Sequence, residues 1–289
     1  MSVKLNTGYN IPLIGLGTYK IVGEEVPPAL DKALTAGYRL FDTAKVYNNE
    51  KEIGDALEVL LPKHGLSRKD VFITTKLHPN TENEVKRLVD ESLRLLKTSY
   101  IDMYLIHYPK SFDYSDEDPK NAELRKATYL ALNQCKHQEK IRSIGVSSYE
   151  IRHLEEIRNF EETPEGQHVA PPCCNQVEYH PHFTRIELKK YCDNNNIFFQ
   201  AFSSLARHNE ALLVSPEVTD LAAKYNVPKT TILLSWATSQ RVGAIPKSTN
   251  AERLSQNLKT VPLTENEVEK VSALNLDKHY VRTTGWLVL

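Results

Sequence analysis

The sequence predicts an α/β fold, a (β/α)8 TIM barrel with an N-terminal β-hairpin and a C-terminal extra helix. Eight short runs rich in apolar and β-branched residues alternate with segments of helical periodicity. No linker rich in proline, glycine or serine divides the 289 residues, a length that one barrel can occupy. Polar residues of catalytic type also follow several of the runs. We therefore expect a single barrel domain spanning residues 1–289.

The hairpin is predicted from the short apolar runs 3–5 and 11–13, which the turn Asn6-Thr7-Gly8-Tyr9 joins. A hairpin in this place can close the bottom of a barrel. The barrel strands are predicted at residues 13–15, 38–41, 71–75, 101–106, 143–146, 174–177, 197–201 and 242–245. Eight strands are the number that a TIM barrel requires.

Helices are predicted between these strands from apolar residues spaced three and four apart. The clearest segments are 27–36, which ends at Gly37, 82–96, with one apolar stripe, and 230–240. A further helical segment, 265–274, follows the last barrel unit. It is the extra C-terminal helix of the predicted fold.

An open, doubly wound sheet with a dinucleotide site is the alternative fold. Its fingerprint, G-x-G-x-x-G, would follow the first strand and open a helix. The chain has Gly15-Leu16-Gly17-Thr18-Tyr19-Lys20, which lacks the third glycine and opens no immediate helix. We reject this alternative.

Composition excludes several classes of partner. The 36 basic and 37 acidic residues give a formal net charge of −1, so no basic surplus favours nucleic acid or an anionic membrane. No stretch approaches the roughly 20 apolar residues of a membrane span, and the N-terminus lacks the apolar stretch of a signal peptide. The four cysteines form no C-x-x-C pair. We expect a cytoplasmic monomer that binds neither nucleic acid nor membrane.

Four residues of catalytic type stand at or near the ends of predicted strands: Asp42, Tyr47, Lys76 and His107. The carboxyl ends of barrel strands form one rim, where active sites are built. A tyrosine has an ordinary pKa of about 10, and a nearby ammonium lowers it by favouring the phenolate. We predict that Lys76 and Asp42 tune Tyr47 as a general acid, and that neutral His107 orients a carbonyl oxygen.

A purely structural role is the alternative for each of these residues. Lys76 and Asp42 could form a structural ion pair, and His107 could be a core histidine. Each residue alone favours that interpretation, whereas the four together at strand ends favour an active site for carbonyl reduction. A zinc site at His180-Pro181-His182 is the other alternative. No matching set of further ligands occurs at other strand ends, so we predict no metal.

Several motifs resemble those of the aldo-keto reductases, in the same order across nearly the whole chain. They are Gly15-Leu16-Gly17-Thr18-Tyr19, Gly37-Tyr38-Arg39-Leu40-Phe41-Asp42-Thr43-Ala44 with Tyr47, Thr74-Thr75-Lys76-Leu77, Leu105-Ile106-His107-Tyr108-Pro109, Gly145-Val146-Ser147-Ser148-Tyr149, Asn175-Gln176-Val177-Glu178-Tyr179-His180-Pro181 and Ile245-Pro246-Lys247-Ser248. The resemblance implies reduction of aldehydes and ketones with NADPH, without a dinucleotide-binding sheet. It assigns the acid role to Tyr47.

The resemblance also implies the residues that bind NADPH/NADP+. They are Thr18, Asp42, Ser147, Ser148, Gln176, Phe202, Ser203, Leu205, Lys247, Ser248, Thr249, Arg253, Gln256 and Asn257. Ser147, Ser148 and Gln176 would hold the nicotinamide carboxamide, and Phe202 would stack on its ring. The residues from Lys247 to Arg253 would bind the adenosine 2′-phosphate, for which cations and hydroxyls are suited.

The chain departs from the family pattern at three of these positions and at the neighbouring Ser204. Ser148 stands where the family has Asn, Phe202 where it has Tyr, Ser204 where it has Pro, and Gln256 where Glu is common. Phe202 keeps an aromatic face and loses a hydroxyl. The substitution at Ser204 predicts a less rigid pyrophosphate loop.

The substrate pocket is predicted to contain Tyr19, Tyr47, His107 and Tyr108. Its aromatic walls discriminate weakly between apolar groups, so we expect several small carbonyl substrates to be accepted. The polar loops 110–121 and 207–216 are expected at the pocket rim and over the cofactor. A barrel that binds NADPH for regulation or structure, with little turnover, remains the alternative function.

Overall fold

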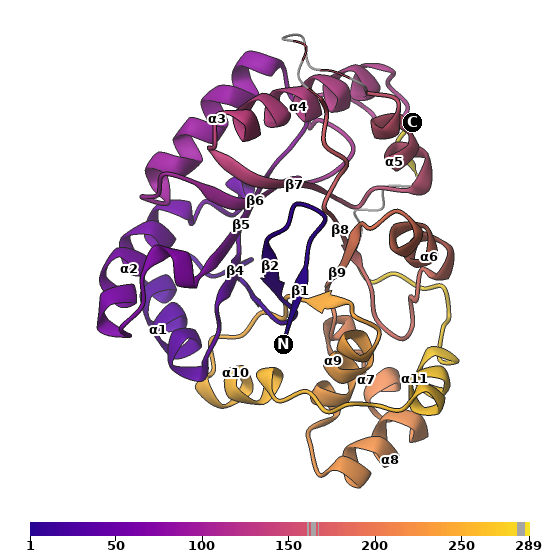
Figure 1. Ribbon diagram of the computed structural model, residues 1–289. Helices are drawn as coiled ribbons and strands as arrows, with labels where there is room; N and C mark the ends of the chain where they lie inside the picture. Colours follow the sequence, from indigo (N-terminus) through magenta and orange to yellow (C-terminus); the bar gives the residue numbers. More distant parts are fainter. Residues whose placement is uncertain (161, 163–165, 167, 282–286) are drawn as a thin grey trace.

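The computed structural model describes residues 1–160, 162, 166, 168–281 and 287–289. Eight parallel strands form one curled sheet in the order β10-β9-β8-β7-β6-β5-β4-β3, with helices outside it (Figure 1). A parallel bridge between Ile14 and Ala244, with the Gly15 amide donating to the Ala244 carbonyl at 2.9 Å, joins the first and last strands. The predicted (β/α)8 fold is confirmed.

The barrel strands lie close to their predicted positions. They are β3 (Leu16–Gly17), β4 (Leu40–Asp42), β5 (Phe72–Leu77), β6 (Ile101–Ile106), β7 (Ile141–Ser147), β8 (Cys174–Glu178), β9 (Phe198–Phe202) and β10 (Gly243–Ala244). The first strand was predicted at 13–15, but those residues pair with the last strand, and β3 begins at Leu16. A Cβ on Gly17 would lie 2.6 Å from the Ile245 carbonyl oxygen, so glycine permits this close approach.

The outer layer consists mainly of helices that connect successive strands. They are α1 (Val26–Ala36), α2 (Glu50–Lys63), α3 (Glu82–Leu95), α4 (Lys120–His137), α5 (Ile151–Arg158), α6 (Ile186–Asn194), α7 (Glu210–Leu213), α8 (Pro216–Tyr225), α9 (Lys229–Ser239), α10 (Ala251–Leu258) and α11 (Glu265–Ser272), with 3-10 turns η1 (Gly23–Glu25), η2 (Lys45–Tyr47), η3 (Arg68–Asp70) and η4 (Ala206–His208). The segment 207–216, expected as a loop, contains α7 and the first residue of α8. The predicted extra helix is α11, which begins with a capping box between Thr264 and Glu267.

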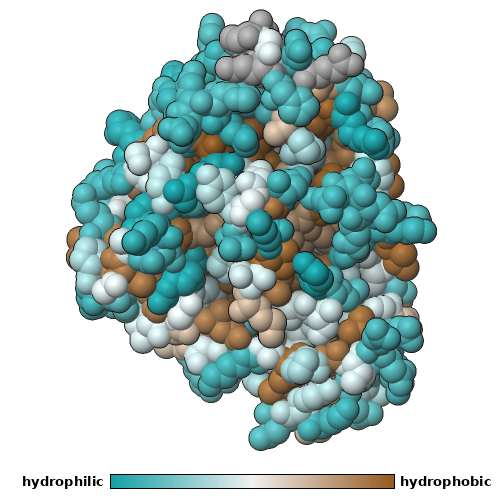
Figure 2. Space-filling view, in the orientation of Figure 1, coloured by the Kyte–Doolittle hydropathy of each residue, from teal (hydrophilic) through white to brown (hydrophobic). Residues whose placement is uncertain are grey.

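The N-terminal hairpin closes one end of the barrel. Its strands β1 (Ser2–Lys4) and β2 (Asn10–Pro12) pair antiparallel and lie across the centre of the ring of strands (Figure 1). Ile11 is fully buried, and it packs in one cluster with Leu40 and Phe72 from the amino ends of β4 and β5. Polar side chains cover much of the outer part of this face, with apolar ones among them (Figure 2). The opposite, carboxyl end of the strands is therefore the end that carries the predicted site.

The C-terminal residues are held against α4 and α5. Val288 is fully buried, and its carbonyl accepts a hydrogen bond from His153 Nε2 at 2.9 Å. The Nδ1 atom of His153 accepts from the Glu150 amide at 3.1 Å, so the ring is neutral with its proton on Nε2. Burial lowers the pKa of His153 to about 4, although the bond to Val288 opposes that shift.

This buried histidine predicts a loss of stability in acid. The folded pKa lies below the unfolded value of about 6.5, so the unfolded state binds more protons. The stability that neutral His153 confers is complete above pH 6.5 and is lost as the pH falls toward 4. By linkage, protonation of His153 should lower the free energy of unfolding of the wild type by about 2 kcal/mol between pH 7.5 and pH 5. His153→Gln should lack this part of the pH dependence.

Urea unfolding at both pH values measures this difference. The exposed histidine of α4 supplies the control, because His137→Gln should keep the wild-type pH dependence. An unchanged pH dependence in His153→Gln would show that His153 does not carry this acid sensitivity.

Candidate active site

The four residues of catalytic type meet at the carboxyl end of the barrel. Lys76 Nζ lies 2.5 Å from Asp42 Oδ1 and also donates to the Thr43 carbonyl at 2.9 Å. The same ammonium lies 5.1 Å from the centre of the Tyr47 ring, and the rings of Tyr47 and His107 are 5.6 Å apart. The ends of β4, β5 and β6, with the turn after β4, thus bring together the Tyr47 phenol, the Lys76–Asp42 ion pair and the His107 ring.

Strand register explains why these side chains converge. Asp42, the last residue of β4, pairs with Thr74 of β5, and Lys76 lies two residues further along β5. Side chains two residues apart on a strand share one face, so Lys76 projects from the same face as Thr74. His107 directly follows β6, where its amide donates to the Leu77 carbonyl at 2.7 Å.

Asn49 holds the turn that carries Tyr47. Its side chain accepts from Thr43 Oγ1 at 2.5 Å and donates to the Thr18 and Ile21 carbonyls at 3.1 and 2.8 Å. The asparagine is fully buried. It therefore ties the Tyr47 turn to the segment after β3, a role that the sequence did not reveal because its partners lie far along the chain.

Burial decides the protonation states of the Tyr47 and His107 rings. Burial raises the pKa of Tyr47, and the Lys76 ammonium only partly opposes this. The expected lowering by Lys76 is thus present but outweighed, and Tyr47 holds its proton at neutral pH. Burial, with Lys76 and His78 adding to it, lowers the pKa of His107 well below its ordinary value. His107 is therefore neutral.

Lys76 keeps its charge because the effect of its neighbours outweighs the effect of burial. Burial by itself lowers the pKa of this fully buried ammonium, but the Asp42 carboxylate and then Tyr47 outweigh burial and raise it. An ion pair in such a place needs further hydrogen bonds. Asp42 has one, because Gln176 Nε2 donates to its second oxygen at 2.8 Å.

The residues predicted to hold the carboxamide lie at or just beyond the ends of β7 and β8. Gln176 Nε2 donates to Asp42 and to Gln200, so its Oε1 atom remains as an acceptor for an amide. Ser148 has φ of 58°, a left-handed conformation that Asn adopts more readily than Ser. Ser147 and Ser148 are buried beside Gln176, whose carbonyl accepts from the Ser148 amide at 2.9 Å. These groups suit a nicotinamide carboxamide.

The segment after β9 contains several residues in the left-handed conformation. Phe202 is half-buried at the end of the strand, and Ser203 has φ of 48°. Ala206, Arg207 and His208 follow with φ of 47°, 51° and 58°. Left-handed residues of this kind are strained and gather at functional sites. The half-buried Leu205 accepts from the His208 amide at 2.8 Å and fixes the turn.

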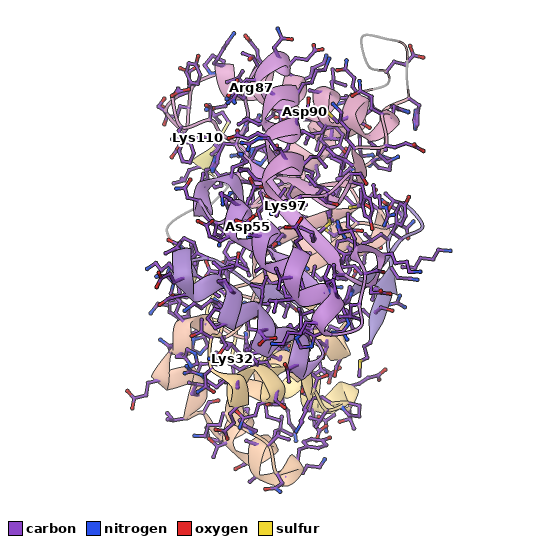
Figure 3. The ribbon with its side chains drawn as sticks, turned by 90° about the vertical axis from the view of Figure 1, so that its left-hand side faces the viewer. Lys32, Asp55, Arg87, Asp90, Lys97 and Lys110 are labelled. Carbon is purple, nitrogen blue, oxygen red and sulfur yellow. The ribbon has the colours of Figure 1, made fainter. Side chains whose placement is uncertain are left out.

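The predicted phosphate site lies at the start of α10. The side chains of Lys247 and Arg253 are exposed and form no ion pair with other described residues. Ser248 is buried, and Lys32 from α1 (Figure 3) donates to the Thr249 carbonyl at 3.3 Å. Sequence reasoning missed Lys32, because its approach to residue 249 depends on the closed barrel.

The two predicted adenine contacts, Gln256 and Asn257, both lie on α10. Gln256 Nε2 donates to Glu252 Oε1 at 3.0 Å, and Asn257 is buried. Thr18 is fully buried at the other side of the predicted cofactor path, where its hydroxyl donates to the Asp42 carbonyl at 2.9 Å.

Two further aromatic residues, His78 and Phe112, lie beside the residues predicted to form the substrate pocket. The Tyr19 ring is 5.2 Å from the Tyr47 ring, and Tyr108 is half-buried beside His107. His78 lies 5.1 Å from His107, and Phe112 stacks on His78 at 3.8 Å. Because His78 directly follows β5, the strand-end rule could have found it. Phe112 belongs to the segment 110–121, which was expected as a loop at the pocket rim and whose last two residues begin α4.

The H-x-H motif anchors a different segment. His180 Nε2 lies 3.0 Å from Glu178, whose carboxylate also accepts the Tyr280 and Val281 amides. His182 Nδ1 bonds to the Tyr280 hydroxyl at 2.7 Å. The described residues contain no group of three or more metal-ligating side chains. Glu178 and these histidines thus fix the chain after α11.

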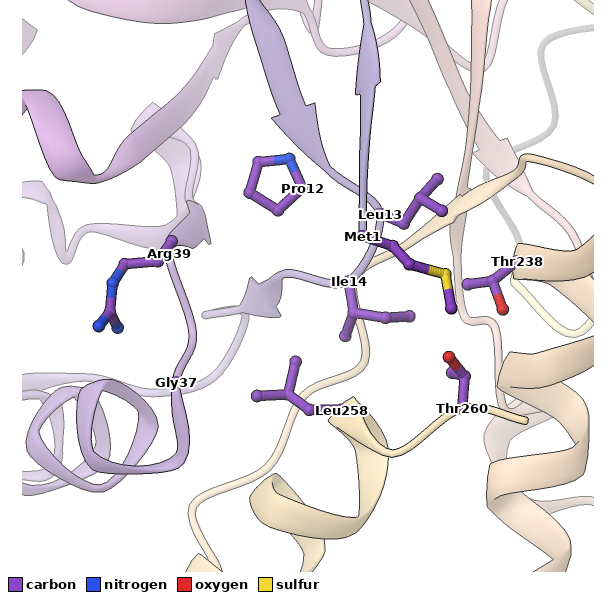
Figure 4. Close-up of a pocket in the computed structure, with 9 residues that line it drawn as sticks. All are labelled: Met1, Pro12, Leu13, Ile14, Gly37, Arg39, Thr238, Leu258 and Thr260. Carbon is purple, nitrogen blue, oxygen red and sulfur yellow. The ribbon is translucent and has the colours of Figure 1, made fainter. Parts of the chain in front are cut away.

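A cavity of about 330 Å³ lies at the hairpin end of the barrel (Figure 4). Met1, Leu13, Ile14 and Leu258 contribute to its wall, and Arg39 is the charged residue among those that line it. None of the catalytic-type residues lines this cavity.

Among the residues placed by the structure, no helix has both the length and the apolar character needed to cross a membrane.

Comparisons with known proteins match nearly the whole chain. Residues 13–276 match the model of the Aldo/keto reductase family. Glyoxal reductase of Bacillus subtilis is 33% identical, over 96% of this chain and 94% of its own. Glycerol 2-dehydrogenase (NADP(+)) of Saccharomyces cerevisiae is 30% identical, over 96% and 91%.

A solved structure extends the agreement to the whole fold. It is the crystal structure of an aldo-keto reductase enzyme from a Medee basin deep-sea metagenome library, with a TM-score of 0.87 at 31% identity, covering 98% of both chains. Fold, site and sequence similarity lead to the same conclusion. The chain belongs to the aldo-keto reductase family of oxidoreductases.

Proposed function

We propose that this protein reduces aldehydes and ketones to alcohols with NADPH, and that Tyr47 is the general acid. The observation that carries the proposal is the buried contact of Lys76 with Asp42, 2.5 Å long, beside the Tyr47 ring. A protonated phenol next to a charged ammonium can donate its proton and be stabilised as a phenolate. Neutral His107 lies opposite Tyr47 and orients the same substrate oxygen.

NADPH, held by the residues assigned above, would supply the hydride that the carbonyl carbon receives and would leave as NADP+. Tyr47 Oη transfers its proton to the carbonyl oxygen, so the products are an alcohol and a tyrosinate. Lys76 stabilises that tyrosinate, and Asp42 keeps Lys76 charged and in place. His107 donates a hydrogen bond to the oxygen while negative charge develops on it. Solvent then returns the proton to Tyr47.

Turnover of NADPH tests the proposal directly. Purified protein should oxidise NADPH in the presence of small aldehydes and not in their absence. Tight NADPH binding without turnover on a broad aldehyde panel would instead support a regulatory or structural barrel. The names of the two relatives, glyoxal reductase and an NADP(+) enzyme acting on glycerol, favour small oxygenated compounds for that panel.

Arg253→Ala is expected to weaken NADPH binding by about ten- to a hundredfold and NADH binding far less. The reason is that only NADPH carries the 2′-phosphate, and a charge-assisted hydrogen bond contributes about 1.5–3 kcal/mol. Fluorescence titration with both cofactors measures the effect. Lys259→Ala, at the other end of α10, is the control and should change neither affinity. Equal losses for NADPH and NADH would show that Arg253 supports the fold instead.

A further inference from the structure

His78 is placed to contact the substrate beside the reacting oxygen. It directly follows β5, two residues after Lys76, and its ring lies 5.1 Å from His107. His107 in turn lies 5.6 Å from Tyr47. A carbonyl oxygen held between Tyr47 and His107 therefore places the neighbouring carbons of the substrate near His78.

The hydrogen-bond role of His78 follows from its contact with Lys110. His78 Nδ1 lies 3.3 Å from the Lys110 carbonyl oxygen, which can only accept, so Nδ1 carries the hydrogen. Burial lowers the pKa of His78 to about 4, which the Lys110 carbonyl partly opposes. The ring is thus neutral at physiological pH, and Nε2 is an acceptor. No described residue donates to Nε2, and it is not among the fully buried atoms that lack partners.

The surroundings hold this acceptor in one orientation. Phe112 stacks on the His78 ring at 3.8 Å. The Lys110 ammonium pairs with Asp116 at 2.7 Å, and fully buried Asn121 accepts from the Ser111 amide and donates to the Ser115 carbonyl. The loop that orients His78 is therefore tied to itself at several points. An acceptor fixed in advance loses little conformational entropy when it binds a donor.

We propose that His78 is a specificity-determining residue, whose Nε2 atom accepts a hydrogen bond from a hydroxyl group close to the substrate carbonyl. The inference rests on the proposed function and names the substrate class that the site favours: hydroxylated aldehydes and ketones. An apolar substrate that displaces water from Nε2 leaves the acceptor unpaired, which weakens binding. A carboxylate in that position would face a lone pair and is disfavoured. The aromatic walls of Tyr19 and Phe112 supply no comparable discrimination.

The test compares glyceraldehyde with propanal, which has the same chain length and no hydroxyls. In His78→Phe, the ratio of kcat/KM for glyceraldehyde to that for propanal should fall about three- to tenfold, the loss expected for one hydrogen bond. The intrinsic reactivities of the two aldehydes cancel when this ratio is compared between variants. His78→Gln, which retains an acceptor, should keep more of the ratio, and exposed His137→Phe should keep all of it.

The outcomes separate this inference from the proposed function. A wild-type protein that reduces neither aldehyde refutes the proposed function and, with it, the inference that depends on it. Turnover of both aldehydes with an unchanged ratio in His78→Phe overturns the His78 proposal alone. A ratio that rises in His78→Phe, or a wild-type preference for glyoxylate over glycolaldehyde, overturns it as well. Titration with NADPH shows whether each variant is folded, and His78→Gln provides the comparison if His78→Phe is not.

Discussion

Replacing Tyr47 by Phe is expected to reduce kcat for a reactive aldehyde by about 10²–10⁴-fold, the usual contribution of a positioned general acid. The substitution removes one oxygen and keeps the ring that packs against Tyr19 and His107 at 5.2 and 5.6 Å. NADPH affinity should therefore change little. Because Tyr47 is protonated at neutral pH, its loss removes the proton donor rather than a charge.

Steady-state NADPH oxidation and a separate cofactor titration measure the two effects. Tyr9→Phe is the matched control, because it removes a hydroxyl from an exposed tyrosine of the N-terminal hairpin, at the other end of the barrel. Its kcat should equal that of the wild type. A fall of less than about tenfold in Tyr47→Phe would mean that another group donates the proton.

The catalytic cluster was predictable because its residues follow the periodic parts of the sequence. Asp42, Lys76 and His107 each lie at or just beyond the end of a strand whose apolar run is visible in the sequence. Parallel strands in a closed barrel then place their carboxyl ends at one rim. The structure confirms the strands and brings these side chains together. Their catalytic roles remain predictions.

Other parts of the site depend on contacts between distant residues. Lys32 reaches the Thr249 carbonyl across 217 positions of the chain, and nothing in the local sequence of α1 indicates this. Asn49 similarly bonds to residues near β3. The direction of the Tyr47 pKa shift was also wrong, because burial opposes the ammonium and outweighs it. Sequence types identify which charges are present, whereas burial depends on packing.

The second large effect is expected from Lys76→Met, which should lower the free energy of unfolding by about 3–5 kcal/mol. Lys76 is fully buried and Asp42 is 1% exposed, so the substitution leaves a carboxylate in the barrel without its cation. Gln176 still donates to Asp42 at 2.8 Å but carries no charge. Urea unfolding at neutral pH measures the loss, and kcat should also fall because the tyrosinate loses its neighbouring ammonium.

The pH dependence of this loss has a definite sign. Without Lys76, burial holds the pKa of Asp42 further above its unfolded value, so the folded state retains a proton that the unfolded state releases. The stability of Lys76→Met, relative to the wild type, is therefore expected to fall as the pH rises from about 4 toward neutrality. Adding Asp42→Asn removes the unpaired charge while keeping the shape of the side chain.

The double variant separates stability from catalysis. Lys76→Met with Asp42→Asn should recover most of the lost unfolding free energy, because neutral groups can replace a buried ion pair at little cost. Its kcat should remain low, since no ammonium lies beside Tyr47. Recovery of both stability and activity would show that the ion pair is only structural, and that Tyr47 donates its proton without help from Lys76.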